Sequence, residues 1–394
     1  MINNEKIVQL TQKLNEQNID TYLILSREDS DTVLPLLIPA HVVAQTAFFF
    51  RSDGKHYVLT GRTDANMYTE MGIFEVIESN DDFDASFKEL FDSLNVKRLA
   101  LNISEHDYLI DGLTVGQYMK LQNIIGKETL KEIEVSSETF IQDLRAIKSD
   151  YEIEQISIAV RKTCTIYKKV RDEITVGMSE TDIGELFVKG MREQGVVNAF
   201  DEPYSYPLIC IVRCGLAHRK PNPANILQDN DILVVDFSVR YNGYCSDIAR
   251  SFYVLPEGEE VADEQSLRAF ETTLKAVSTI IDGIRPGMKG WEVDKLGRDV
   301  IEQSGYPTIR HASGHQLGRQ VHDGGTALSY DHPDRPAVRQ KVRDREVYAI
   351  EPTVIQDDGK PSFIVEEDIV MTPQGAKVLS ERQMELYYIR RSRS

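Results

Sequence analysis

The first third of the chain alternates between helical and strand-like patterns of apolar residues. Helical spacing recurs in three segments, residues 4–17, 82–94 and 115–125. Two shorter segments have the apolar content of strands, residues 21–25 and 98–104. Residues 47–62 predict a hairpin that turns at Ser52–Asp53–Gly54. This alternation predicts an α/β domain with its own core.

The pattern changes after residue 135. A long, charged stretch with helical character covers residues 136–173, and a second helix is predicted over 181–195. From Tyr206 onward strand-like segments dominate, interrupted by helical spacing over 263–283 and 290–304. We therefore predict an α/β domain over residues 1–135 and an α+β domain over residues 136–394.

Charge and composition exclude several classes of function. The net charge is -18, with 63 acidic against 45 basic residues, which would repel nucleic acid and anionic membrane surfaces. The first residues are polar and lack the apolar core of a signal peptide, and no stretch has the apolar length of a membrane span. The 4 cysteines are few for 394 residues, which favours a reducing cytoplasm.

Two aspartates stand in strands that otherwise have the pattern of buried ones. The stretch LVVDFSVRYNGYCSDI predicts a hairpin that turns at Asn242–Gly243 and carries Asp236 and Asp247. The midpoint of their numbers falls within the turn, so the two side chains should lie within a residue or two of register. Neighbouring carboxylates repel each other unless a cation lies between them, so one interpretation of the pair is a metal site. The alternative is that both are solvated aspartates of the hairpin.

Histidines gather in RHASGHQLGRQVHDGG, which contains His311, His315 and His322. The four-residue spacing of the first two invites comparison with the helical HExxH zinc motif. Position 312 is not Glu, and Gly314 and Gly318 disfavour a helix. An extended segment fits better, and we expect it to place only some of these histidines inward.

Two later strands each add an acid. Glu351 lies inside EVYAIEPTVI, and FIVEEDIVMT contains the adjacent Glu366 and Glu367, of which only one can face a given site. Carboxylates with imidazole suit divalent Mn, Co, Fe or Zn, while oxygen-only sets suit Mg or Ca. Bridging carboxylates would hold two ions, roughly 3.5–4 Å apart in such sites.

The order of these pieces resembles the pita-bread metallopeptidases, which include prolidase, aminopeptidase P and methionine aminopeptidase. The pieces are DFSVRYNGYCSD, SGHQLG, IEP and EEDIVMT, and the resemblance runs from about Leu144 to the end. It implies a pita-bread catalytic domain over residues 136–394. Residues 1–135 resemble the smaller N-terminal domain of the prolidase and creatinase branch.

The resemblance implies which residues form the site. It assigns the metal ligands to Asp236, Asp247, His315, Glu351 and Glu366, with Asp247 and Glu366 bridging two ions. Manganese is the expected metal, with cobalt, zinc or iron as alternatives. Catalytic and substrate-binding roles fall to Glu351 as general base, to His218 and His322, and to His311 as a further substrate-binding residue.

Two positions depart from the family pattern. Ala249 stands where the family often has Thr, and Ile364 stands where the prolidase branch usually has Arg. Both departures leave the ligand set complete.

The implied function is hydrolysis of the bond before proline, in Xaa-Pro dipeptides or at the N-terminus of longer peptides. We therefore expect a cytoplasmic, homodimeric metallo-exopeptidase with a peptide or small-molecule substrate and no nucleic acid or membrane partner. A metal-dependent hydrolase or lyase of a small non-peptide compound on the same fold is the alternative. A protein-binding relative without activity is a further one, although such relatives typically lose the ligands.

Overall fold

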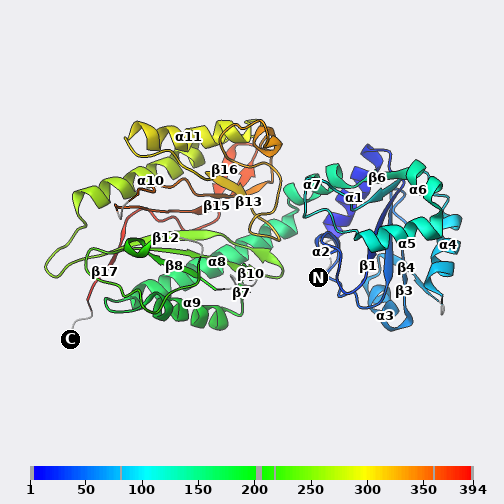
Figure 1. Ribbon diagram of the computed structural model, residues 1–394, viewed down its shortest axis with the longest axis horizontal. Helices are drawn as coiled ribbons and strands as arrows, with labels where there is room; N and C mark the ends of the chain where they lie inside the picture. Colours follow the sequence, from blue (N-terminus) through cyan, green and yellow to red (C-terminus); the bar gives the residue numbers. More distant parts are fainter. Residues whose placement is uncertain (1–3, 80–81, 201–205, 217–218, 358–359, 392–394) are drawn as a thin grey trace. The chain divides into compact units, whose positions relative to one another are not determined.

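The computed structural model describes residues 4–79, 82–200, 206–216, 219–357 and 360–391. The chain divides into two compact units, residues 1–145 and 146–394, called here the N-terminal and C-terminal units (Figure 1). The division lies ten residues after the boundary expected from the sequence.

The N-terminal unit is built on a mixed sheet with strand order β4-β3-β2-β1-β5-β6. Its strands are β1 (Thr21–Ser26), β2 (Thr46–Arg51), β3 (His56–Thr60), β4 (Phe74–Glu78), β5 (Leu99–Leu101) and β6 (Glu134–Ser136). Its helices are α1 (Asn4–Glu16), α2 (Leu34–Leu37), α3 (Arg62–Met71), α4 (Phe83–Leu94), α5 (Val115–Ile125), α6 (Lys127–Ile133) and α7 (Glu138–Ala146). Phe48 and Phe50 pack in one apolar cluster and Phe49 in another, so helices cover both faces of the sheet.

The C-terminal unit contains two larger sheets, ordered β17-β12-β9-β8 and β13-β14-β15-β16, and a small sheet ordered β11-β10-β7. The strands are β7 (Val197–Asn198), β8 (Leu208–Ile211), β9 (Ile232–Phe237), β10 (Val239–Tyr241), β11 (Tyr244–Cys245), β12 (Ile248–Val254), β13 (Gly314–Gln316), β14 (Val347–Ile350), β15 (Glu367–Thr372), β16 (Gly375–Val378) and β17 (Tyr387–Ile389). The helices are α8 (Asp150–Glu173), α9 (Glu180–Gln194), α10 (Glu264–Gly283) and α11 (Gly290–Gln303). Helices α8 and α9 pack in one apolar cluster, and α10 and α11 in the other (Figure 1). The arrangement confirms the predicted fold class.

The stretch 136–173 is not one helix, which corrects the sequence-based expectation. Helix α7 ends at Ala146, and α8 begins at Asp150. The Ser149 side chain accepts a hydrogen bond from the backbone of Glu152, whose carboxylate accepts one from the backbone of Ser149. This capping box satisfies amides that a new helix leaves unpaired, so it starts α8 at this point.

The aspartate hairpin forms as predicted. Strands β9 and β12 are antiparallel, and Asp236 lies opposite Ala249. Asn242 and Gly243 have φ angles of 49° and 82°, the left-handed conformation that a type I′ turn requires. Asp236 and Asp247 are therefore two residues out of register and share a face, because side chains alternate along a strand.

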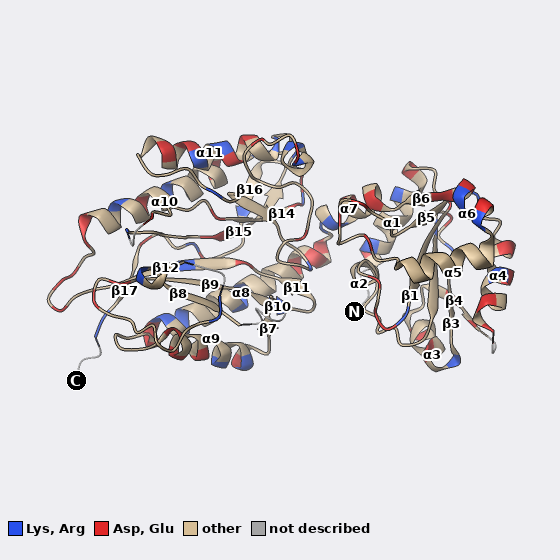
Figure 2. Cartoon of the chain, viewed as in Figure 1, with Lys and Arg blue, Asp and Glu red and all other residues tan. Residues whose placement is uncertain are grey.

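Charged side chains are spread along the helices of both units (Figure 2). Acids also stand close to the ends of β9, β14 and β15, which belong to the two larger sheets of the C-terminal unit. Among the helices of the described residues, none combines the length and the apolar character that crossing a membrane requires.

Candidate metal centre and active site

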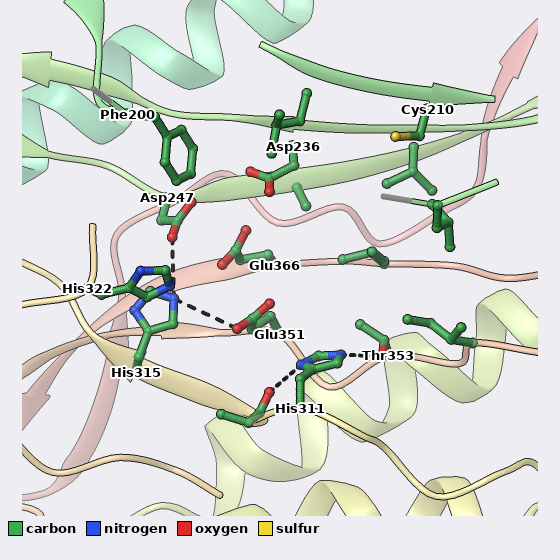
Figure 3. Close-up of a pocket in the computed structure, with 17 residues that line it drawn as sticks. Phe200, Cys210, Asp236, Asp247, His311, His315, His322, Glu351, Thr353 and Glu366 are labelled. Carbon is green, nitrogen blue, oxygen red and sulfur yellow. Dashed lines mark hydrogen bonds and ion pairs between the residues drawn. The ribbon is translucent and has the colours of Figure 1, made fainter. Parts of the chain in front are cut away.

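A cavity of about 460 Å³ in the C-terminal unit brings together residues of both larger sheets. Its lining includes every predicted site residue that the structure describes, namely Asp236, Asp247, His311, His315, His322, Glu351 and Glu366 (Figure 3). All three clustered histidines face the cavity, so the expectation that only some would do so was wrong. His218 lies outside the described residues.

Strands and their ends position the acidic residues. Asp236 is on β9, Glu351 directly follows β14, and Glu366 directly precedes β15. The backbone amide of Glu366 donates to the carbonyl of Ala249 on β12 at 3.1 Å, which joins the two sheets at the site. Side chains from segments more than a hundred residues apart therefore point toward one another (Figure 3).

His315 presents one ring nitrogen to the acids. Its Nδ1 lies 3.2 Å from the carbonyl oxygen of Gln316, which fixes the proton on this nitrogen. Its Nε2 lies 3.4 Å from Oδ2 of Asp247 and 3.8 Å from Oε1 of Glu351. One ligand atom each of Asp247, His315 and Glu366 lies within 4.8 Å of the others, so these three residues form a group that could hold a metal ion.

The carboxylates repel one another in a site where each of them is buried or half-buried. Burial, followed by the charges of Asp247 and Glu351, raises the pKa of both Asp236 and Glu366 well above the ordinary range. Burial also raises the pKa of Glu351 to about 7, although His315 opposes this shift. Burial alone would lower the pKa of His315, but Asp247 and Glu351 raise it to about 9.

Divalent cations fit this group of residues. Oδ1 of Asp236 is buried and has no hydrogen-bond partner among the described residues, and such an orphaned oxygen is costly unless it has a partner. A cation would supply that partner and remove the repulsion that raises the carboxyl pKa values. The mixture of carboxylate and imidazole donors suits Mn, Co, Fe or Zn.

The other two cavity histidines have different surroundings. The ring of His322 lies 4.4 Å from that of His315, measured between centroids, so it borders the acidic group. Nε2 of His311 lies 2.8 Å from the Thr353 hydroxyl, and its Nδ1 lies 2.6 Å from the Ala312 carbonyl. Both ring nitrogens of His311 therefore have protein partners, and its role in substrate binding stays a prediction.

Glu367 points away from the site, as the strand alternation predicts. It is fully buried and pairs with Arg250 at 3.0 Å, and it also accepts hydrogen bonds from Ser380 and from the backbone of Gln383. Arg250 in turn donates to the backbone carbonyl of Glu366 at 2.6 Å. This pair therefore supports the strand end that presents Glu366.

The sequence analysis missed two residues that hold Asp247. The hydroxyl of Ser238 donates to Oδ1 of Asp247 at 2.6 Å, and Oδ2 of Asp368 accepts from the Asp247 backbone amide at 3.0 Å. Ser238 could have been found, because the hairpin register places it opposite Asp247. Asp368 could not, because its contact depends on how the two sheets meet.

Comparisons with known proteins show which family and which relatives the chain is similar to. The model of metallopeptidase family M24 matches residues 154–373. An Xaa-Pro dipeptidase of Pyrococcus furiosus is 28% identical over 281 residues, which is 68% of this chain and 72% of that protein. An uncharacterized peptidase of Bacillus subtilis is 26% identical over 79% of this chain and 81% of its own length.

Solved structures share the fold. An Xaa-Pro dipeptidase from Bacillus anthracis has a TM-score of 0.78 and 21% identity, covering 98% of this chain and 99% of that one. An X-Pro aminopeptidase from Thermotoga maritima has a TM-score of 0.75 and 21% identity, covering 97% and 99%. Both units of the chain therefore have counterparts in these proteins.

Proposed function

Because the chain belongs to metallopeptidase family M24, we propose that it is a two-metal exopeptidase that hydrolyses the bond before proline. The observation that carries the proposal is the convergence of Asp236, Asp247, Glu351 and Glu366 with His315 in one cavity. We propose these five as the metal ligands, with Asp247 and Glu366 bridging.

Bound divalent metals would supply Lewis-acid chemistry, lowering the pKa of water and polarising a carbonyl. Glu351, which lines the cavity and lies 3.8 Å from Nε2 of His315, would take the proton of the attacking water and pass it to the leaving nitrogen. His322 borders the acids and would donate a hydrogen bond to the developing oxyanion, a contribution of about 3 kcal/mol. His218 is proposed for the same role on the resemblance alone.

Specificity for proline is supported by the names of relatives and by the cavity wall. The Pyrococcus furiosus and Bacillus anthracis proteins are both named Xaa-Pro dipeptidases. Beyond the acids, apolar side chains such as Leu208 and Val234 offer a surface for the pyrrolidine ring. Because the proline nitrogen carries no hydrogen, the site cannot bind this peptide bond through a hydrogen bond donated by that nitrogen.

Hydrolysis assays on metal-stripped and refilled protein test the proposal. The panel contains Xaa-Pro dipeptides, Xaa-Pro tripeptides and the same peptides with alanine in place of proline. The protein is refilled with Mn, Co or Zn, and Asp247→Ala serves as the inactive control. We expect cleavage that depends on metal and on proline and that is absent from the variant.

Two results would contradict this reading. Tight binding of two metals without cleavage of any peptide would move the function to a small non-peptide substrate. If the protein bound no metal, the proposed two-metal mechanism would be wrong, and a protein-binding role without activity would be favoured.

We further propose that manganese is the native metal and that the protein is a cytoplasmic homodimer. These proposals rest on the resemblance and on the small number of cysteines. Metal analysis of protein purified without added metal tests the first proposal. Sedimentation at several concentrations and fractionation of the source cells test the others.

A further inference from the structure

The cavity wall has two chemically different parts. Acids and histidines form one part, and the remainder is predominantly apolar (Figure 3). The apolar part includes Leu208, Cys210, Val234, Ala249, Ile355 and Ile364. A substrate that reaches the acids therefore lies against a surface that forms no ion pair with it.

No Lys or Arg lines the cavity among the described residues. Residues 201–205 and 217–218, which follow the cavity residues Phe200 and Leu216 in the sequence, read DEPYS and AH and contain neither residue type. Arginines of the surrounding elements have other partners. Arg219 pairs with Glu180, Arg250 pairs with Glu367, and Arg240 donates to the carbonyl of Ala199.

Among the described residues, neither Lys or Arg nor the proposed metal–acid group provides a net positive charge in the cavity for a substrate anion. Asp236, Asp247, Glu351 and Glu366 carry up to four negative charges, which two divalent ions would offset in full. In an Xaa-Pro dipeptide the free carboxylate is attached to the proline Cα, two bonds from the scissile nitrogen. It would be held close to the acids and against the apolar wall, where an unpaired charge is unfavourable.

We infer that the cavity selects substrates that are uncharged directly after proline, that is Xaa-Pro peptides of three or more residues or Xaa-Pro amides, and rejects free dipeptides. This inference rests on the proposed function and names its substrate class. In a longer peptide the proline carboxylate is replaced by a neutral amide, and the terminal charge lies farther from the acids.

The test compares Ala-Pro, Ala-Pro amide and Ala-Pro-Ala on the metal-loaded enzyme. We expect kcat/KM to be on the order of a hundredfold higher for the two uncharged forms. Calorimetric titration gives a readout independent of turnover, using N-acetylproline and N-acetylprolinamide, which keep a neutral amide before proline, lack the free amino terminus of an exopeptidase substrate and differ in the charge after proline. N-acetylprolinamide should bind more tightly by a similar factor.

A matched pair of variants introduces the missing charge. Ile364 is half-buried in the cavity wall, so a longer side chain at this position can extend into the cavity. In Ile364→Arg the new guanidinium can pair with the dipeptide carboxylate. The ratio of kcat/KM for Ala-Pro amide to that for Ala-Pro should therefore fall at least about tenfold. Ile364→Met, which is also unbranched but carries no charge, should leave the preference unchanged. Thermal unfolding shows that both variants are folded.

Arg310 provides the remaining control. It precedes His311 in the sequence, but its side chain is exposed. Its Nη2 lies 3.4 Å from Oδ2 of Asp357, whose side chain is also exposed. Arg310→Ala should therefore leave the preference unchanged. The inference would be overturned if Ala-Pro were cleaved and its analogue N-acetylproline bound as well as, or better than, the corresponding amides. This holds whether or not Arg310→Ala abolished the cleavage of Ala-Pro. If none of the three peptides is cleaved, the proposed function fails, and the titration decides the charge preference separately.

Discussion

Asp247 is held at three points. Ser238 donates to Oδ1, His315 faces Oδ2, and Asp368 accepts from the backbone amide. An acid intended to bridge two ions must present both oxygens in fixed directions, and contacts behind the ligands provide that orientation. Ser238 therefore positions a proposed ligand and is not itself proposed as one.

Replacing Ser238 by alanine tests this role. Ser238→Ala should weaken metal binding by about 10–100-fold, because Asp247 loses the hydrogen bond that orients it. Ser246→Ala is the matched control, since this buried serine bonds Thr163 and the backbone of Val239 instead. Competition with a metal-binding dye measures both affinities. Equal affinities for the two variants would contradict the role given to Ser238.

At the scale of elements, most features set by local sequence patterns could be predicted, whereas features set by contacts between sheets could not. The turn at Asn242–Gly243 fixed the register of β9 and β12, so the side-by-side placement of Asp236 and Asp247 followed from one short stretch. The capped break before α8 was missed, because the helical pattern of charged and apolar residues continues across it. The apolar cavity wall was not predicted either, since Leu208 and Ile355 line the same cavity only because separate segments pack together.

The break before α8 has a buried charge beside it. Lys148 and Asp323 form an ion pair at 3.2 Å, each only 2% exposed, and Asp323 follows the cavity residue His322. Lys148→Met should cost about 3–5 kcal/mol of unfolding free energy, because Asp323 loses its buried cation. Adding Asp323→Asn should recover part of that loss. Urea unfolding measures these changes, and Lys168→Ala, which removes an exposed pair, should leave the midpoint nearly unchanged.

Glu180 in the first turn of α9 anchors the segment that follows β8. Its fully buried carboxylate pairs with Arg219 and accepts from the backbone amides of Ile211 and Asn222. Burial would raise its pKa, but Arg219 and the amides lower it below the ordinary value of 4.5. Folding therefore favours the ionised carboxylate of Glu180. The resulting stabilisation is complete at pH values well above 4.5 and is lost as the pH falls through the lowered pKa.

Glu180→Gln tests this link between charge and stability. We expect a loss of roughly 2–3 kcal/mol that is constant above about pH 6 and shrinks below pH 4.5. Urea unfolding of both proteins in EDTA, from pH 7 to pH 4, separates this effect from metal loss. A difference that stayed constant across the whole range would show that the carboxylate is not stabilised by ionisation.

At the scale of the whole molecule, the two compact units should respond differently to metal. All described residues of the cavity belong to the C-terminal unit, and each unit has its own apolar clusters. Calorimetry should therefore show two transitions, of which Mn²⁺ raises only one. At a hundred times Kd the stabilisation is about 2.7 kcal/mol, which raises that transition by roughly 5–10 °C. A joint shift of both transitions would show that the units unfold together.

The wide sequence separation of the acids also has a consequence for biosynthesis. Asp236 and Glu366 lie 366 − 236 = 130 residues apart. Ribosomes add about 5–20 residues per second, so a nascent chain carries the first acids for on the order of ten seconds before the last one exists. The proposed bridge cannot close during that interval. The enzyme should therefore acquire its full metal complement only after translation has passed Glu366, which makes cellular metal supply at that moment part of its maturation.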